Sequence, residues 1–148
     1  MAAENLRPFM SAAAAKEVVA AIGELDLHPD VAHGMRRLAG AGVRLMTLTN
    51  GSAETAAELL GRGGVSDLVE RNLSVSEVRR WKPAPEPYRL AVERAGVRAD
   101  RVALVAVHPW DVDGAQRAGL VGAPYPDTFS APAIAAGDLV ALADALLD

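Results

Sequence analysis

Hydrophobic residues recur along the chain at two spacings, one typical of helices and one typical of strands. In the segment Ser11–Leu25, Val18, Ile22 and Leu25 fall on one helical face, behind an alanine-rich start for which Ser11 is a good N-cap. The same reasoning predicts further helices at Pro29–Gly40, Ser52–Leu60, Pro85–Ala95, Asp111–Ala118 and Asp138–Leu147.

Strand patterns lie between these helices. Val43–Leu48 is mostly apolar, and Val102–Val107 is a continuous apolar run of the kind that is buried on both faces of a parallel sheet. Arg71–Val75 is a weaker candidate, and Gly122–Pro132 is expected to be loop. Strands that alternate with helices predict an α/β protein whose parallel sheet is joined by crossover helices.

Composition narrows the class of protein. Of 148 residues, 51% are hydrophobic and 23% charged, which argues against intrinsic disorder. The absence of cysteine excludes disulfides, zinc-thiolate sites and cysteine nucleophiles. The net charge of −4 argues against nucleic acid as a partner, and no apolar run is long enough for a membrane span. We therefore expect a cytoplasmic protein that acts without nucleic acid or membrane.

Two of the predicted strands end in residues suited to chemistry. Thr49-Asn50-Gly51-Ser52 follows the first strand and supplies hydroxyls, an amide and N–H groups at a helix N-terminus, which can bind an anion. The alternative is an ordinary N-cap with a tight glycine turn. His108-Pro109-Trp110-Asp111 follows the clearest strand, and here the alternative is that Asp111 caps a helix while Trp110 packs beneath it. Ligands bind at such carboxyl ends in open parallel sheets.

Lys82 is the third candidate. Only two of the fifteen basic residues are lysines, Lys16 and Lys82. The prolines of Trp81-Lys82-Pro83-Ala84-Pro85 stiffen the loop, so that the ammonium group could neutralise a carboxylate nucleophile or a substrate anion. The alternative is a surface lysine in a turn.

Together these segments resemble the haloacid dehalogenase superfamily, and within it the type II L-2-haloacid dehalogenase-like branch. The resemblance rests on the residues around Pro29, on Leu48-Thr49-Asn50-Gly51-Ser52, on Trp81-Lys82-Pro83-Ala84-Pro85 with Tyr88, and on Val107-His108-Pro109-Trp110-Asp111. It implies a Rossmann-like parallel sheet with crossover helices and a small helical cap. It also implies a reaction in which a nucleophilic aspartate displaces halide from a 2-haloacid and water hydrolyses the aspartyl ester.

The resemblance implies roles for residues at the matching positions. Thr49 and Asn50 would hold the substrate carboxylate and the halide side, Lys82 would steady the nucleophile, and Asp111 would orient Lys82 and assist hydrolysis. Tyr88, His108 and Trp110 would line the pocket of a small-molecule carboxylate substrate. No metal or other cofactor is implied in the dehalogenase branch, whereas the related phosphatases bind magnesium. His108 stands where well-studied dehalogenases have asparagine, and Ala106 stands where serine is common.

The chain departs from the family at its start. The family opens with a strand that ends in the nucleophilic aspartate and then forms most of the cap, and neither is found here. We therefore assign residues 1–26 to a remnant of the cap and residues 27–148 to a partial core. A second short strand is missing between Leu120 and Gly122. Because the lost strand lies centrally in the family's sheet, we predict that Val43–Leu48 pairs directly with Val102–Val107, or that a homodimer supplies the missing pairing.

Three functional hypotheses follow. The chain belongs to a haloacid hydrolase whose nucleophile lies in an upstream segment or a separate chain, or it is a catalytically inactive remnant, or it is a module that binds an anion or a partner. A magnesium-dependent phosphatase is a further alternative. For the chain as written, we expect no catalytic activity by itself.

Overall fold

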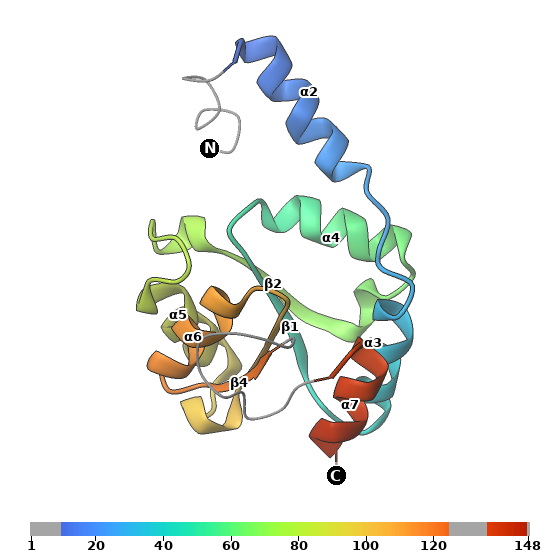
Figure 1. The fold of residues 1–148 in the computed structure, drawn as a ribbon, viewed down its shortest axis with the longest axis vertical. Coiled ribbons are helices and arrows are strands. Elements are labelled where there is room, and N and C mark those ends of the chain that lie inside the picture. Colours follow the sequence, from blue (N-terminus) through green and yellow to red (C-terminus); the bar gives the residue numbers. More distant parts are fainter. Residues whose placement is uncertain (1–9, 125–135, 148) are drawn as a thin grey trace.

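Parallel strands and helices alternate along the chain, as the hydrophobic pattern predicts (Figure 1). The computed structural model describes residues 10–124 and 136–147. The strands are β1 (Leu45–Thr49), β2 (Val69–Ser74), β3 (Ala103–Ala106) and β4 (Val121–Pro124). The helices are α2 (Ala12–Gly23), α3 (Val31–Gly40), α4 (Ala53–Arg62), α5 (Pro85–Ala95), α6 (Pro109–Arg117) and α7 (Leu139–Leu147). The α/β fold class is confirmed.

Helix starts follow the expected capping residues. The Ser11 hydroxyl accepts the Ala14 N–H at 3.2 Å, and the Ser52 hydroxyl accepts the Thr55 N–H at 3.2 Å. α5 and α6 both begin with proline, which is tolerated in the first turn because its missing N–H has no partner there. For this reason α6 starts at Pro109, two residues before the predicted Asp111.

The strands form two sheets of two strands each, β1 with β2 and β3 with β4, both parallel. The predicted direct pairing of Val43–Leu48 with Val102–Val107 is therefore wrong within the described residues. Each strand pairs instead with the strand that follows it through one crossover helix, α4 for β2 and α6 for β4. These are the pairings that a short βαβ connection closes locally. The predicted homodimer stays a prediction.

The strand β4 corrects the loop prediction for Gly122–Pro132 and the gap predicted after Leu120. Val121–Pro124 pairs with Ala103–Ala106, and the Val121 N–H donates to the Val102 carbonyl at 2.9 Å. Residues 125–132 of the predicted loop lie outside the described residues. A segment that is short and rich in glycine and proline becomes a strand here because a parallel neighbour satisfies its backbone.

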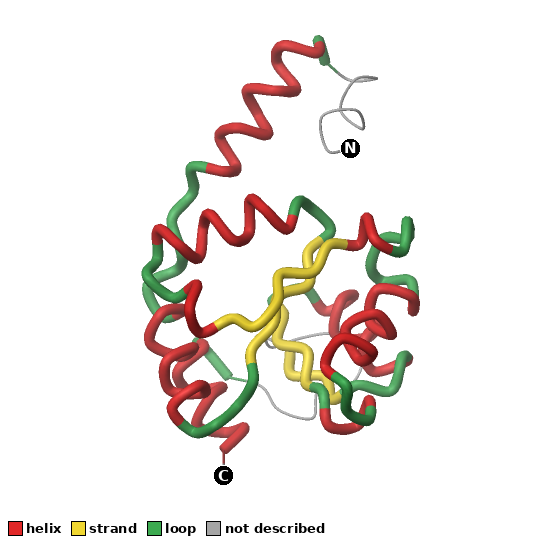
Figure 2. Tube along the Cα trace, turned by 180° about the vertical axis from the view of Figure 1, so that it is seen from behind, coloured by secondary structure: helices red, strands yellow, loops and turns green. Residues whose placement is uncertain are grey.

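Helices pack around the strands in two groups. Figure 2 shows the strands at the centre, with α3 and α7 on one side and α5 and α6 on the other. One core cluster is formed by Met35, Leu60 and Val65, with Leu45 packed against it. The other is formed by Tyr88, Ala115 and Leu120, with Leu48 packed against it. β1 thus contacts both clusters and lies where the two groups meet.

The carboxyl-terminal helix is anchored on α3. A Cβ at Gly34 would lie 2.6 Å from Leu139 Cγ and 2.9 Å from the Leu139 carbonyl oxygen, so only glycine allows this close approach. Asp30 accepts the Leu139 N–H at 2.7 Å, and Arg37 forms an ion pair with Asp144. These contacts bring the first and last parts of the core together.

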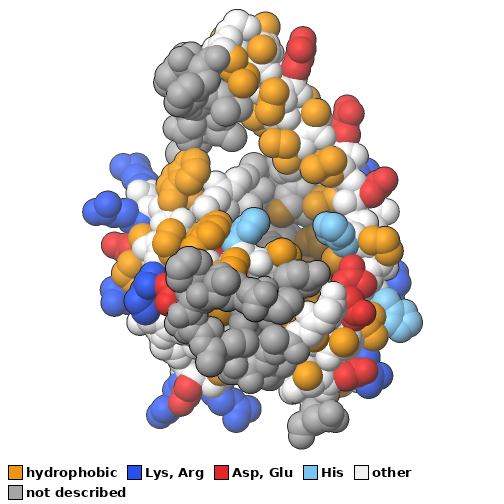
Figure 3. Space-filling view, viewed as in Figure 1, with side chains coloured by type: hydrophobic (Ala, Val, Ile, Leu, Met, Phe, Trp, Pro, Cys, Tyr) orange, Lys and Arg blue, Asp and Glu red, His pale blue; other side chains and the backbone are white. Residues whose placement is uncertain are grey.

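α2 stands away from the rest of the molecule (Figure 1). Its apolar face is largely exposed, with Ile22 at 55% exposure and, just beyond the helix, Leu25 at 59%. Figure 3 shows hydrophobic side chains along this helix. Arg62 of α4 donates to the carbonyls of Gly23 and Leu25 at 2.5 and 2.8 Å and fixes the end of α2. The assignment of residues 1–26 to a cap remains a prediction. Across the described residues, no helix has the length and apolarity that crossing a membrane requires.

Candidate active site

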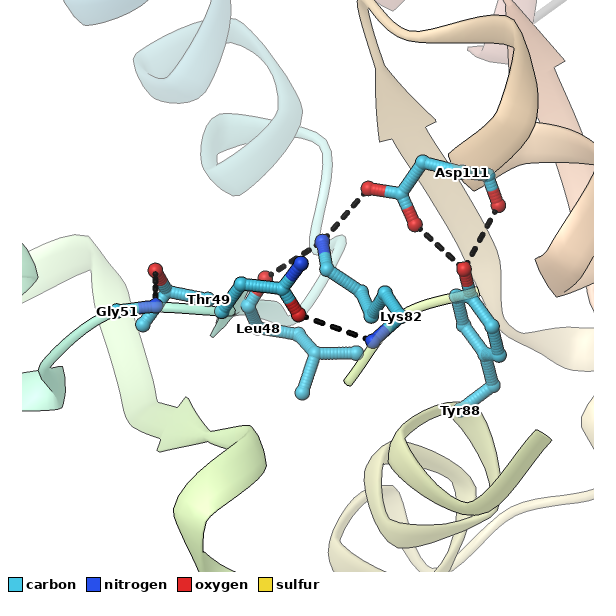
Figure 4. Close-up of polar contacts among 7 residues, drawn as sticks. Leu48, Thr49, Gly51, Lys82, Tyr88 and Asp111 are labelled. Atoms are coloured by element: carbon cyan, nitrogen blue, oxygen red, sulfur yellow. Dashed lines mark hydrogen bonds and ion pairs between the residues drawn. The ribbon is translucent and has the colours of Figure 1, made fainter. Parts of the chain in front are cut away.

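Lys82 lies where the carboxyl ends of β1 and β3 meet. Its ammonium group donates to the Leu48 carbonyl of β1 at 3.0 Å and to Asp111 Oδ2, on the helix that follows β3, at 2.6 Å (Figure 4). The Lys82 N–H donates to Asn50 Oδ1 at 3.0 Å. The side chains of Lys82 and Asp111 are only 9% and 6% exposed. The structure thus brings together three of the predicted site residues and excludes the surface-lysine alternative.

Tyr88 holds the other side of Asp111. Its hydroxyl donates to Asp111 Oδ1 at 2.6 Å and lies 3.1 Å from the Asp111 carbonyl oxygen (Figure 4). Burial raises the pKa of the Tyr88 hydroxyl, and the hydrogen bond to Asp111 and its negative charge raise it further. Tyr88 therefore stays protonated and remains a donor. Both carboxylate oxygens of Asp111 are engaged, one by a cation and one by a hydroxyl.

Close packing fixes this arrangement. A Cβ at Gly114 of α6 would lie 2.6 Å from the Tyr88 hydroxyl oxygen and 2.7 Å from Pro83 Cβ. Gly114 therefore lets the loop of Lys82 and the first turns of α5 approach α6 closely. The sequence analysis did not single out Gly114.

The loop after β1 uses its own side chains as caps. The Thr49 hydroxyl accepts the Gly51 N–H at 2.9 Å, and the Ser52 hydroxyl, which caps α4, donates to Glu54 Oε2 at 2.5 Å. This hydrogen bond lowers the pKa of the exposed Glu54 carboxyl. An anion at the start of α4 would meet a carboxylate that is already there. The capping alternative thus accounts for Ser52, and Thr49 is bonded to its own loop rather than to Lys82.

Ser74 is a buried residue of this region that the sequence analysis missed. Its hydroxyl donates to the Gly51 carbonyl at 2.7 Å and accepts the Ser76 N–H at 3.2 Å. The register places Ser74 opposite Thr49, so the ends of β2 and β1 lie together. The weak strand prediction for Arg71–Val75 contained the signal, since adjacent parallel strands end at the same edge.

His108 and Trp110 stack on each other at the start of α6. Their ring centroids are 5.4 Å apart with an interplanar angle of 13°. Trp110 is 40% exposed and Trp81, beside Lys82, is 50% exposed. Trp110 thus does not pack beneath the helix, which was the alternative to a functional role. Whether the pair lines a substrate pocket stays a prediction.

The comparisons with known proteins point to one family. A family model described as haloacid dehalogenase-like hydrolase matches residues 3–119. This range includes Thr49, Asn50, Lys82 and Asp111. The chain belongs to the haloacid dehalogenase-like hydrolases. The resemblance stated from the sequence is confirmed at this level.

Similar members of the family are dehalogenases. The chain is 37% identical over 91 residues to haloacetate dehalogenase H-2 of Moraxella sp. (strain B), covering 62% of this chain and 41% of the relative. It is 27% identical over 128 residues to (S)-2-haloacid dehalogenase H-109 of Pseudomonas putida, covering 82% and 57%. The chain therefore spans about half of the length of these curated relatives, from 41% to 57%.

Solved structures show the same fold. L-2-haloacid dehalogenase from Xanthobacter autotrophicus, solved with chloropropionic acid covalently bound, superposes with a TM-score of 0.83 at 22% identity, covering 93% of this chain and 67% of that one. The Rossmann-like core expected for a haloacid dehalogenase-like hydrolase is confirmed by this likeness.

Proposed function

We propose that this chain carries the Lys82–Asp111 half of a hydrolase that converts a 2-haloacid into a 2-hydroxyacid. The observation that carries the proposal is the buried ion pair at the carboxyl ends of β1 and β3, held by Tyr88 and Asn50. The names of the relatives, which are haloacetate and 2-haloacid dehalogenases, support the substrate class.

The proposed reaction has two steps. A carboxylate oxygen attacks the carbon that bears the halogen, a C–O bond forms, and halide leaves with the bonding electrons. Water then attacks the ester carbonyl, and cleavage of the acyl C–O bond restores the carboxylate and releases the hydroxyacid and one proton to solvent. The ammonium group of Lys82 would stabilise the attacking carboxylate, and Asp111 would hold Lys82 and take part in positioning the water.

Asp111 is poorly suited to be the nucleophile. Tyr88 and Lys82 occupy its two oxygens, and its side chain is almost fully buried. Among the other described aspartates, Asp30 accepts the Leu139 N–H and Asp100 pairs with Arg98 at the surface. We propose that none of these three aspartates is the nucleophile and that this chain by itself does not turn over.

The remaining site residues would bind substrate. Asn50 accepts the Lys82 N–H, and Thr49 precedes Asn50 in the sequence. Both would contact the substrate carboxylate, while His108, Trp110 and Tyr88 would form the walls of the pocket. We propose that the reaction needs no metal. A magnesium ion at Asp111 would have to displace Lys82 or Tyr88, so the engaged oxygens fit a metal poorly.

Haloacid binding and halide release test the proposal separately. The two tryptophans, Trp81 and Trp110, adjoin Lys82 and Asp111 in sequence, so intrinsic fluorescence reports on the site. We expect L-2-chloropropionate to change this fluorescence, and Lys82→Met to weaken binding by about tenfold or more because a charge-assisted hydrogen bond is lost. Lys16→Met, which alters the exposed lysine of α2, is the matched control.

The activity assay distinguishes the alternatives. We expect no halide release from L-2-chloropropionate with this chain by itself. Release that disappears in Lys82→Met would show that the chain is active and that the nucleophile lies within it. Magnesium-dependent hydrolysis of p-nitrophenyl phosphate would favour a phosphatase, and absence of haloacid binding would contradict the proposed substrate class.

A further inference from the structure

The Ser74 hydroxyl uses all of its hydrogen-bonding capacity inside the protein. Its oxygen accepts the Ser76 N–H at 3.2 Å and the Ser76 hydroxyl at 2.9 Å. A serine hydroxyl has two acceptor lone pairs and one proton, so Ser76 takes up both lone pairs. The proton is then left to donate to the Gly51 carbonyl at 2.7 Å. Ser76 therefore orients the hydroxyl of Ser74, a residue that is only 6% exposed.

Gly51 is held at both of its backbone polar groups. Its carbonyl accepts the Ser74 proton, and its N–H donates to the Thr49 hydroxyl at 2.9 Å (Figure 4). Asn50 lies between Thr49 and Gly51 in the sequence. The turn that carries Asn50 is thus fixed to the end of β2, where Ser74 stands opposite Thr49 in the register.

Ser74 also lies at the start of the connection that leads to Lys82. The short 3-10 turn η2 (Val75–Glu77) begins directly after Ser74, and the chain continues from it to Lys82. At the far end of this connection, the Lys82 N–H donates to Asn50 Oδ1 at 3.0 Å. The two loops are therefore joined twice, once through Ser74 and Gly51 and once through Lys82 and Asn50.

The bond from Lys82 decides which atoms of the Asn50 amide are left for a ligand. Because Oδ1 accepts a backbone N–H, the two N–H donors of Nδ2 remain. The structure gives these donors no acceptor among residues 10–124 and 136–147. Two amide donors suit an acceptor such as a carboxylate. They keep their direction only while the two loops keep their relative position, since a shift of either loop would break the bond from Lys82 to Asn50.

We propose that Ser74, oriented by Ser76, is a positioning residue that directs the amide donors of Asn50 toward a carboxylate ligand. This role rests on the proposed function, since it concerns the ligand of the same site. Ser74 acts through the Gly51 carbonyl and the turn that carries Asn50, and not by contact with the ligand. Loss of its hydroxyl should therefore weaken the bond between Lys82 and Asn50 and ligand binding together.

Amide hydrogen exchange of Lys82, resolved by NMR on the full isotope-labelled chain without ligand, reports on the position of Asn50. Asn50 Oδ1 is the acceptor of this N–H, so the protection of the N–H measures that bond. Ser74→Ala should speed Lys82 exchange by about fivefold, the effect of losing one neutral hydrogen bond. It should weaken L-2-chloropropionate binding, followed by tryptophan fluorescence, by a similar factor. Ser74→Thr, which keeps the hydroxyl, should restore both.

Thr47→Val is the matched control. Thr47 lies on the same pair of strands, and its hydroxyl donates to Asn72 Oδ1 at 2.7 Å. This variant removes a half-buried hydroxyl bond between β1 and β2, as Ser74→Ala removes a bond at their ends. It should leave Lys82 exchange and L-2-chloropropionate affinity unchanged. If Ser74 served stability alone, the two variants would behave alike.

Unchanged Lys82 exchange in Ser74→Ala would overturn the proposal, and so would equal acceleration by Thr47→Val. If Ser74→Ala does not fold, the exposed Ser76→Ala replaces it, because this variant removes one of the two bonds that orient Ser74. It should speed Lys82 exchange by about twofold or more, and no change would equally overturn the proposal.

The two measurements separate this role from the proposed function. Equal L-2-chloropropionate affinity of Ser74→Ala and the unaltered chain would refute the positioning role and leave the proposed function intact. Faster Lys82 exchange in Ser74→Ala, in a chain that binds no L-2-chloropropionate, would refute the proposed function and leave the control of Asn50 by Ser74 intact.

Discussion

The buried ion pair between Lys82 and Asp111 gives the sharpest prediction for stability. The two side chains are 9% and 6% exposed and the Nζ–Oδ2 distance is 2.6 Å, so removal of one partner leaves a charge that water cannot solvate. Breaking such a pair costs about 3–5 kcal/mol. After Lys82→Met, Asp111 keeps the Tyr88 hydroxyl as a donor. We therefore expect a loss near the lower end, about 3 kcal/mol, out of a total of about 5–15 kcal/mol for a domain.

A double-mutant cycle measures the interaction itself. Lys82→Met, Asp111→Asn and the double variant are unfolded with urea and followed by circular dichroism and tryptophan fluorescence. The losses in free energy of unfolding of the two single variants should add up to more than the loss of the double variant. The difference, which is the coupling energy, should exceed about 1.5 kcal/mol. The same cycle on Arg98 and Asp100, whose side chains are 84% and 58% exposed, should give a coupling within the error of the measurement.

A small coupling energy would contradict this prediction. A coupling energy below about 0.5 kcal/mol for Lys82 and Asp111 would mean that the two groups are solvated or apart in solution. In that case the ends of β1 and β3 would not hold a preorganised site.

Three further predictions concern the surroundings of this pair. Tyr88→Phe should reduce the loss of stability at alkaline pH. Because its pKa is raised, folded Tyr88 keeps its proton above about pH 10 while the unfolded chain loses it, so the wild type should lose up to about 1.4 kcal/mol of unfolding free energy per pH unit there. Urea unfolding from pH 9 to 11 measures this difference. Gly114→Ala should lower the free energy of unfolding by about 1–3 kcal/mol because its Cβ would overlap Tyr88 and Pro83, whereas Gly61→Ala, with nothing within 4 Å, should not destabilise; an unchanged urea midpoint for Gly114→Ala would contradict the packing. Ser74→Ala should cost about 1–3 kcal/mol because the Gly51 carbonyl loses its donor, with Ser74→Thr as the variant that keeps the hydroxyl; equal stability of the two variants would show that the hydroxyl is not needed.

Local signals in the sequence were sufficient for most elements. Capping serines and N-terminal prolines fixed the starts of α2, α4 and α5, and the apolar runs located β1 and β3. The partnership of Lys82 with Asp111 could be expected from family resemblance, since the two residues are 29 positions apart and no local pattern relates them.

Features that depend on contacts between distant parts of the chain could not be predicted from the sequence, for physical reasons. Strand pairing depends on which edges meet in space, so the prediction that β1 pairs with β3 rested on sheet order and failed. β4 was missed because Val121–Pro124 has poor intrinsic strand propensity and is held by its neighbour β3. Ser74 and Gly114 were missed because their importance lies in what faces them, a carbonyl in one case and a tyrosine in the other.

The position of the ion pair is better explained by chemistry than by stability. Replacing a buried pair by apolar residues of similar volume is often neutral or stabilises by about 1–4 kcal/mol, because the charges no longer have to leave water. The combination Lys82→Met with Asp111→Leu should therefore unfold at a urea concentration equal to or above that of either single variant. The same double variant should lose haloacid binding. A chain that folds at least as well without the pair but recognises no carboxylate would assign Lys82 and Asp111 to the site, and a double variant less stable than both single variants would assign them to the fold.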